Sequence, residues 1–235
     1  SKVFVAGGNA SGKASNKVFY IDAATDKQWK QLPDFPGEAR VQPVLAAIEK
    51  ENDTLLYVLG GFFGGDATKA PTMGEKVLAF SLKQQQWQEV GVQENPNKEI
   101  FSLTGATALA IDNRYIACFG GVNHSLFINT IIDLYHLGKD TSLTDEQRKQ
   151  KNYDYMSHYM TQPIEYYKFN KECYLFDTHT QQWSVLDTQA DFARAGATLV
   201  GTPAEFYLVQ GELKPGVRSP KTYRLKINYP RTTND

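Results

Sequence analysis

The sequence predicts an all-β fold made of repeated antiparallel sheets, and three observations indicate it. The chain of 235 residues contains 13 Tyr and 13 Phe, and aromatic residues favour strands. Three apolar runs end in a pair of glycines, at residues 7–8, 60–61 and 120–121. Each of the three tryptophans follows the start of another apolar run by 10 or 11 positions (18 to 29, 77 to 87 and 173 to 183). A four-stranded unit that recurs along the chain accounts for all three.

Each unit is expected to contain four strands, here named a to d. Strand a is apolar, strand b ends in the glycine pair, strand c carries aromatic residues and strand d opens with tryptophan. The first unit lacks strand a, and the last unit lacks strand d. The 14 expected strands, unit by unit, are 2–8, 18–22 and 29–32; 41–48, 55–61, 77–80 and 87–90; 104–111, 115–121, 173–177 and 183–186; 196–200, 206–211 and 222–225.

The period of these units indicates the architecture. The second glycines lie at positions 8, 61 and 121, so the steps are 53 and 60 residues. Kelch repeats have a period of about 50 residues and form the four-stranded blades of β-propellers. Glycine suits the end of strand b, because a Cβ has no room near the crowded axis. We therefore predict a kelch-type β-propeller with about four blades in this chain. Residues 1–235 are expected to form one incomplete domain, and a further segment is expected to cover its open edge.

A helical insertion interrupts the third unit between Gly121 and Cys173, and we place it at residues 139–170. Residues 144–147 have the Thr-x-x-Gln pattern of a capping box, with Thr144 as the N-cap. A helix over residues 145–160 is expected to follow and to end before Pro163. Long ordered insertions in compact domains are usually lids or binding loops. A lid over the mouth of the propeller is one interpretation, and a surface helix without a role is the other.

The strand directions predict which face of the propeller carries the site. Because neighbouring strands run in opposite directions, the b–c and d–a connections of all units open on the same face. Loops that a rigid scaffold holds are where binding and catalytic residues concentrate. The candidate site residues expected on this face are Arg40, Gln42, Asn123, Arg194, Glu212 and Arg218.

Composition and motifs argue against several classes of function. The formal net charge of −1 disfavours nucleic acid or an anionic membrane as the main partner, and no apolar run approaches the roughly 18 residues of a membrane span. Residues 7–14 nearly spell a P-loop but lack its final Ser or Thr. The four histidines and two cysteines have no metal-ligand spacing. We expect Cys118 and Cys173 to be buried free thiols.

The fourth unit departs from the repeat at the end of its strand b. Gly211 is followed by Glu212, which we interpret as replacing the second glycine, and Arg218 follows after a Pro-Gly turn. A carboxylate near the axis is expected to be partly desolvated and suited to proton transfer. Arg218 would either neutralise it or hold an anionic ligand. A structural Glu–Arg pair that closes a tight loop also explains the spacing.

The same stretch resembles the bacterial N-acetylneuraminate epimerases, which are sialic acid mutarotases built as six-bladed kelch propellers. The resemblance extends from about Asp34 to Leu225. Six blades need more chain than this, and an opening on a glycine-pair strand resembles the circularly permuted branch, so two blades are expected to be absent. The residues that carry the resemblance are Gly211-Glu212-Leu213-Lys214-Pro215-Gly216-Val217-Arg218, Gly120-Gly121-Val122-Asn123, Gly138-Lys139-Asp140, Thr180-Gln181-Gln182-Trp183 and the linker Phe35-Pro36-Gly37-Glu38-Ala39-Arg40-Val41-Gln42.

The resemblance implies an isomerase that interconverts the α and β anomers of sialic acid without a cofactor. The catalytic acid of the family falls on Glu212 and its arginine on Arg218, while its first linker places Arg40 and Gln42. The two arginines are expected to hold the carboxylate of the acidic sugar. The family also implies a periplasmic location.

Two further positions, Asn123 and Arg194, complete the expected set of substrate-binding residues. Gln42 and Asn123 are expected to bond the hydroxyl or N-acetyl groups of the sugar. The alternative to an enzyme is a propeller that only binds a protein or a glycan, as many propellers do. In that case the carboxylate of Glu212 has no catalytic role.

Overall fold

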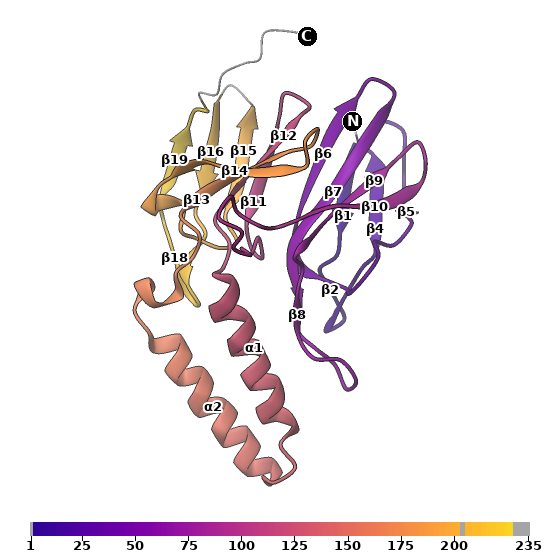
Figure 1. The fold of residues 1–235 in the computed structure, drawn as a ribbon. Coiled ribbons are helices and arrows are strands. Elements are labelled where there is room, and N and C mark those ends of the chain that lie inside the picture. The colour runs from indigo at the N-terminus through magenta and orange to yellow at the C-terminus, as the bar shows by residue number, and fades with distance from the viewer. Residues whose placement is uncertain (1, 203–204, 228–235) are drawn as a thin grey trace.

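The computed structural model describes residues 2–202 and 205–227. Its main strands form four antiparallel sheets, the blades of a β-propeller (Figure 1). Blade 1 contains β1 (Lys2–Ala6), β4 (Val18–Asp22) and β5 (Lys30–Leu32), and blade 2 contains β6 (Val41–Lys50), β7 (Asp53–Phe63), β9 (Lys76–Ser81) and β10 (Gln86–Val92). Blade 3 contains β11 (Thr107–Ile111), β12 (Tyr115–Phe119), β13 (Glu172–Asp177) and β14 (Gln182–Thr188), and blade 4 contains β15 (Thr198–Thr202), β16 (Glu205–Val209) and β19 (Thr222–Leu225).

The sheet order agrees with the strand assignment made from the sequence. Blades 2 and 3 contain strands a to d in the orders β6-β7-β9-β10 and β11-β12-β13-β14. Blade 1 contains strands b, c and d, and blade 4 contains strands a, b and c. In every blade, strand b pairs antiparallel with strand c. Within the described ranges, no strand pairing joins blade 1 to blade 4.

The hydrophobic core lies between the blades. In β7, Leu56 and Val58 belong to the cluster shared with blade 1, whereas Tyr57 and Leu59 belong to the cluster shared with blade 3. Successive side chains of a strand point to opposite faces, so a central blade contributes to two clusters at once. A third cluster joins blades 3 and 4. Strands β6, β11 and β15 contact one another in sequence, so the a strands lie innermost, around the propeller axis.

The glycine pairs at the end of strand b correct one part of the sequence alignment. The first glycine of each pair has a left-handed backbone, as at Gly60 with φ of 63°, and the equivalent residue of blade 4 is Gln210 with φ of 53°. Gln210 therefore replaces the first glycine, and Glu212 follows the second glycine instead of replacing it. The error arose because Gln210 occupies the position of the first glycine, so Gly211 was matched to that glycine in place of the second. The alignment is fixed by one hydrogen bond per blade, from the N–H ahead of strand c to the carbonyl of the second glycine: Ser15 to Gly8, Gly74 to Gly61, Asn170 to Gly121 and Ser219 to Gly211.

The insertion after Gly121 consists of α1 (His124–Lys139), α2 (Asp145–Thr161) and the short 3-10 helix η1 (Ile164–Tyr167). Helix α2 begins at the predicted capping box. In that box Thr144 Oγ1 accepts from Gln147 N at 3.2 Å, and Gln147 Oε1 accepts from Thr144 N at 2.8 Å. The sequence did not predict α1. The helical insertion therefore begins at His124, well before the predicted start at residue 139.

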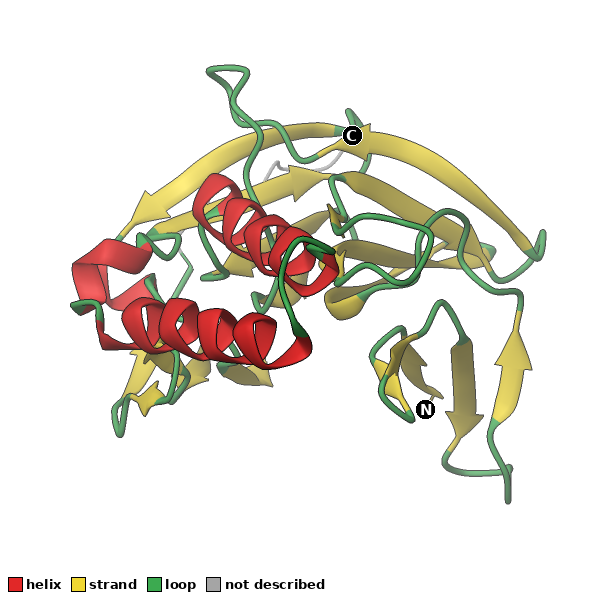
Figure 2. Ribbon diagram, turned by 90° about the horizontal axis from the view of Figure 1, so that it is seen from below, coloured by secondary structure: helices red, strands yellow, loops and turns green. Residues whose placement is uncertain are grey.

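The b–c connections lie at one end of the molecule, as predicted from the strand directions. At this end Figure 1 shows the hairpin of β2 (Asn9–Ala10) with β3 (Lys13–Ala14), the short β8 (Thr72–Met73) and both helices. Seen from this end, the helices lie in front of part of the sheets, and the strands beside the N-terminus are not covered by them (Figure 2). Lys139 Nζ donates to the carbonyls of Asp66 and Ala67, and Phe127 packs edge-on against Phe62 with 5.0 Å between the ring centroids. The insertion of blade 3 is therefore tied to the b–c connection of blade 2.

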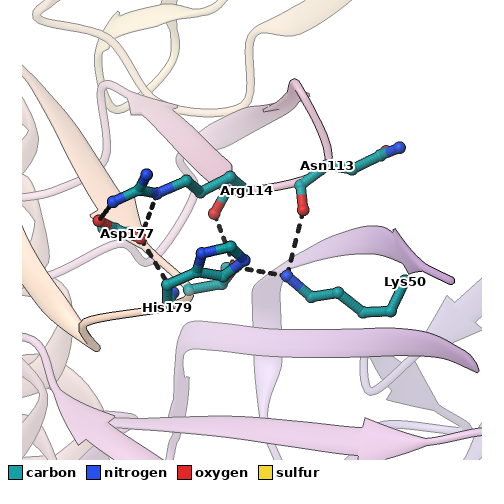
Figure 3. Close-up of polar contacts among 6 residues, drawn as sticks. Lys50, Asn113, Arg114, Asp177 and His179 are labelled. Atoms are coloured by element: carbon teal, nitrogen blue, oxygen red, sulfur yellow. Dashed lines mark hydrogen bonds and ion pairs between the residues drawn. The ribbon is translucent and has the colours of Figure 1, made fainter. Parts of the chain in front are cut away.

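A polar cluster joins blades 2 and 3 on the opposite face, at the a–b and c–d turns (Figure 3). Lys50 Nζ donates to Asn113 O at 3.2 Å and to Thr178 Oγ1 at 3.3 Å. Within blade 3, Arg114 donates to both carboxylate oxygens of Asp177, at 3.0 and 2.6 Å. Burial alone would raise the pKa of Asp177, but hydrogen bonds from Arg114 and from backbone N–H groups outweigh it and lower the pKa to about 2.

The two cysteines are buried free thiols, as predicted. Burial raises the pKa of both Cys118 and Cys173, the latter to about 12, so both stay protonated and act as small apolar core residues. In the part of the chain that the structure describes, no helix is long and apolar enough to cross a membrane. The same residues contain no group of three or more His, Cys, Asp or Glu arranged to hold a metal ion.

Candidate active site

Glu212 and Arg218 face each other across a short hairpin of blade 4. The hairpin consists of β17 (Glu212–Lys214) and β18 (Val217–Arg218), joined by a Pro-Gly turn. Gly216 in this turn has φ of 76°, which glycine adopts without steric cost. The register pairs Glu212 with Arg218, and Arg218 Nη2 lies 3.4 Å from Glu212 Oε1. The structure thus brings together the two residues to which the resemblance assigns catalysis.

The side chains of this pair are accessible to a ligand. The side chain of Glu212 is 32% exposed and that of Arg218 is 69% exposed. An exposed ion pair is screened by water and contributes at most about 1 kcal/mol to folding. The contact is also single, so the guanidinium keeps N–H donors for a second acceptor. These properties favour a binding role over a bridge that only closes the loop.

The backbone of Glu212 is held by the linker that leads into blade 4. Glu212 N donates to Ala195 O at 2.7 Å, and Ala195 N donates to Glu212 O at 2.9 Å. Ser219 N donates to Gly211 O at 2.8 Å and closes the base of the hairpin. The Cα of Glu212 is therefore fixed against the start of the innermost strand, and only its side-chain torsions remain free.

Gln42 belongs to the same neighbourhood through backbone hydrogen bonds around the axis. A residue with a left-handed backbone lies near the start of each a strand. These residues are Gln42, Gly105 and Gly196, which occupy equivalent positions and have φ of 54°, 71° and 62°. Gly105 N donates to Gln42 O at 3.2 Å, and Gly196 N donates to Gly105 O at 2.7 Å. A Cβ placed on Gly105 would lie 3.2 Å from Ala195 Cβ and 3.6 Å from Gln42 Oε1. The amide of Gln42 thus lies next to the linker that holds Glu212.

Arg40 is buried and braces the backbone of blade 2. Its Nη1 donates to Gly60 O and to Lys76 O, both at 3.2 Å. Burial lowers its pKa to about 10, which keeps the guanidinium charged at neutral pH. Arg40 also lines a cavity of about 400 Å³ together with Glu38 and Glu75. Nη1 on one side of the guanidinium already donates to two backbone carbonyls. A contact between Arg40 and a substrate stays a prediction.

Arg194 makes the equivalent brace in blade 4, a structural role that the sequence did not reveal. Arg194 follows the 3-10 helix η2 (Ala190–Phe192) and is 2% exposed. Its Nε donates to Asp191 O at 2.8 Å, and its Nη1 donates to Gln210 O at 2.7 Å. Its Cζ lies 4.8 Å from the centroid of the Tyr223 ring. A guanidinium buried and engaged in this way supports the backbone of blade 4, and a substrate contact by Arg194 stays a prediction.

Asn123 has a structural task that the sequence did not reveal. It is the N-cap of α1, and its Oδ1 accepts a hydrogen bond from Leu126 N at 3.0 Å. It also lines a cavity of about 580 Å³, together with Asn170 and Tyr174. Its contact with a substrate remains a prediction, for which its side-chain nitrogen has two donors.

One ionisable pair on this face was missed by the sequence analysis. His124 Nε2 lies 2.8 Å from Glu75 Oε1, and the contact joins the start of α1 to the b–c connection of blade 2. Glu75 lines the cavity next to Arg40, whereas His124 lines the larger cavity next to Asn123. The two residues are 49 positions apart, so no local spacing could have indicated the pair.

Comparison with known proteins shows the family. A family model described as N-acetylneuraminate epimerase matches residues 2–233. The chain belongs to the N-acetylneuraminate epimerase family. Proteins named N-acetylneuraminate epimerase from Escherichia coli (strain K12) and Shigella flexneri are each 30% identical over 215 residues, which cover 91% of this chain and 53% of the relative. A solved structure titled "Structure of YjhT" matches with a TM-score of 0.78 at 26% identity, covering 97% of this chain and 59% of that chain.

The chain therefore spans about half the length of the curated epimerases that it matches. The resemblance that the sequence motifs indicated is confirmed, and the structural match confirms the β-propeller class. Family membership by itself does not place the reacting groups in this chain. In the hairpin of blade 4, the two residues of the epimerase-like motif, Glu212 and Arg218, lie opposite each other.

Proposed function

We propose that this protein accelerates the interconversion of the α and β anomers of N-acetylneuraminate. The names of the relatives support the substrate, and the hairpin of blade 4 supports the chemistry. The observation that carries the proposal is the accessible Glu212–Arg218 pair, in which a carboxylate lies 3.4 Å from a guanidinium. Such a pair combines a group that can move a proton with a group that can hold an anion.

Anomer exchange needs only proton movements. The anomeric hydroxyl loses its proton, the bond between the anomeric carbon and the ring oxygen breaks, and the ring oxygen gains a proton. The open-chain keto acid then closes on the other face of its carbonyl by the reverse steps. A single carboxyl group that alternates between base and acid, with water as a relay, suffices for this sequence. In the proposal Glu212 takes this role.

Arg218 is the proposed ligand of the substrate carboxylate. Sialic acid carries this carboxylate on its anomeric carbon, and a guanidinium binds a carboxylate through two parallel hydrogen bonds. A sugar held in this way by Arg218 brings its reacting oxygens towards the neighbouring Glu212. The exposure of Arg218 supports the assignment, because only its Nη2 contacts Glu212 and the rest of the guanidinium can bind another acceptor.

A further contact with the substrate is proposed for Gln42, and its strained backbone conformation supports this role. A left-handed backbone costs a non-glycine residue roughly 1–2 kcal/mol, and the equivalent positions in the next two blades are glycines. Strain of this kind is concentrated at functional sites. The amide of Gln42 is a suitable partner for the hydroxyl or N-acetyl groups of the sugar, as is the side-chain nitrogen of Asn123.

We also propose that a further segment completes the propeller around this site. Val3 and Val5 of blade 1 and Val200 of blade 4 are exposed, whereas apolar side chains of the central blades are buried between neighbouring sheets. The greater length of the curated relatives supports a covering segment. The formal charge of −1 argues against nucleic acid or an anionic membrane surface as the main partner. A periplasmic location rests on the family resemblance alone, and cell fractionation tests it.

The test of the proposed function is the rate of anomer exchange in the full-length protein. The α anomer is released enzymatically from a sialoside, and proton NMR follows its conversion with and without the protein. The expected result is a faster approach to the same equilibrium ratio. Binding of sialic acid with an unchanged spontaneous rate would overturn the mutarotase and support a propeller that only binds its ligand.

A further inference from the structure

We propose that Lys214 is a positioning residue that fastens the Glu212–Arg218 hairpin to the end of helix α2. This inference rests on the function proposed above. Lys214 is the last residue of β17, and its Nζ donates to Gln162 O at 2.7 Å and to Met160 O at 3.3 Å. Helix α2 ends at Thr161, so both acceptors lie at its C-terminus.

The end of α2 is a suitable anchor for a lysine. The last carbonyl groups of a helix have no partner within the helix, and they form the negative end of its macrodipole. An ammonium group offers three donors and no acceptor, so it can bind several of these carbonyls at once. Lys214 therefore satisfies the end of α2 from outside the helix and ties it to blade 4.

The hairpin needs such an anchor at its tip. A two-stranded hairpin is at best marginally stable on its own, and only two residue pairs join β17 and β18, with an irregularity between them. The linker into blade 4 holds the base of the hairpin but not its tip. At the tip, a Cβ on Gly216 would lie 3.6 Å from Met160 Cε, so the turn itself also packs against α2. Without these contacts β18 is free to move relative to β17, and Arg218 loses its fixed distance from Glu212.

The anchor gives the insertion a role in positioning the hairpin. Tyr155 of α2 donates its hydroxyl hydrogen bond to Asp133 of α1 at 2.9 Å, and Lys139 of α1 binds the backbone of blade 2. A continuous set of contacts therefore leads from blade 2 through both helices to Lys214. The position of the proposed reacting pair in blade 4 is set partly by a blade on the other side of blade 3.

The experiment compares Lys214→Met with Lys214→Arg, and with Lys149→Met as a control, in the full-length protein. Lys149 is an exposed lysine of α2. The measurements are kcat and KM for anomer exchange, the thermal midpoint, and hydrogen exchange of the peptide 212–219. Lys214→Met should lower kcat by roughly 10- to 100-fold, the effect of a displaced reacting group, with a smaller change in KM and an unchanged thermal midpoint. Its hairpin amides should exchange faster, Lys214→Arg should recover most of the kcat, and Lys149→Met should match the wild type.

Three results would overturn the proposal. The first is wild-type kcat in Lys214→Met, and the second is unchanged hydrogen exchange of its hairpin. The third is a loss of kcat that Lys214→Arg does not restore, together with a lower thermal midpoint and faster hydrogen exchange throughout blade 4. That combination would indicate general destabilisation of the blade. If the wild type itself does not accelerate anomer exchange, the mutarotase function fails, while hydrogen exchange still decides whether Lys214 anchors the hairpin.

Discussion

Replacing Glu212 by Gln should remove most of the anomer exchange and leave the fold intact. The Glu212–Arg218 pair makes a single contact of 3.4 Å between exposed side chains, so its loss should lower the free energy of unfolding by at most about 1 kcal/mol. A change of that size shifts the thermal midpoint by roughly 2–4 °C in a protein of this length. The hydrogen bonds between Glu212 and Ala195 involve only the backbone and are kept.

The loss of activity should be much larger than the loss of stability. General acid–base catalysis contributes a factor of roughly 10² to 10⁴, which corresponds to about 2.7–5.4 kcal/mol of activation free energy. Glutamine has the shape of the glutamate side chain but cannot take up and release the proton. The NMR assay of the released α anomer gives the rate, and thermal unfolding gives the stability of the same sample. Binding of sialic acid should persist, because Arg218 remains.

Glu205→Gln is the matched control for this substitution. Glu205 forms an ion pair with Arg224, with Nε and Oε1 2.8 Å apart, but it begins β16, whereas Glu212 follows the end of that strand. The control should exchange anomers at the wild-type rate. Full activity in Glu212→Gln would refute the assignment of the acid–base role. Equal losses in both variants would show that the rate depends on the stability of blade 4 and not on proton transfer.

Three further predictions follow from other parts of the structure. Arg218→Lys should raise KM roughly tenfold or more, the equivalent of one charged hydrogen bond, with a smaller effect on kcat, as kinetics over a range of substrate concentrations will show. Arg194→Met should lower the free energy of unfolding in urea by about 3 kcal/mol, because the protein loses two part-buried hydrogen bonds from a charged guanidinium to backbone carbonyls, whereas the exposed Arg224→Met should lower it by about 1 kcal/mol or less. Asp177 has a folded pKa of about 2, below its ordinary value of 3.8, so its pair with Arg114 stabilises the protein fully above that ordinary value. This stabilisation is lost as the pH falls towards 2, and Asp177→Asn should remove this part of the acid dependence of the thermal midpoint.

The fold could be predicted because its signals are local and repeated. Alternating apolar residues, the glycine pairs and the tryptophans each lie within a few positions of the strand they define. The same reasoning found α2 from the capping box at Thr144. It missed α1 because the apolar residues 126–128 (Leu-Phe-Ile) are equally suited to a strand, and no acidic residue marks the first turn.

The site could be predicted only in part, because much of it depends on contacts between distant segments. The motif around Glu212 and Arg218 is contiguous, and its hairpin geometry follows from the Pro-Gly turn. The structural role of Arg194 could not be predicted. From the sequence alone, an arginine that binds backbone carbonyls cannot be distinguished from one that binds a sugar. Gln210 also misled the alignment, because a non-glycine residue with φ of 53° cannot be recognised from its type.

The placement of the core between the sheets has a consequence for how stability is distributed along the chain. In an open arc, each central blade is held from two sides and each end blade from one, so opening should start at the ends and spread inwards, as in other linear repeat arrays. Joining the two ends of an arc adds one more apolar interface, which protects both end blades. The hairpin that holds Glu212 lies in blade 4, one of the end blades of the described arc. The order around this site is therefore expected to increase sharply once the neighbouring blade is in place.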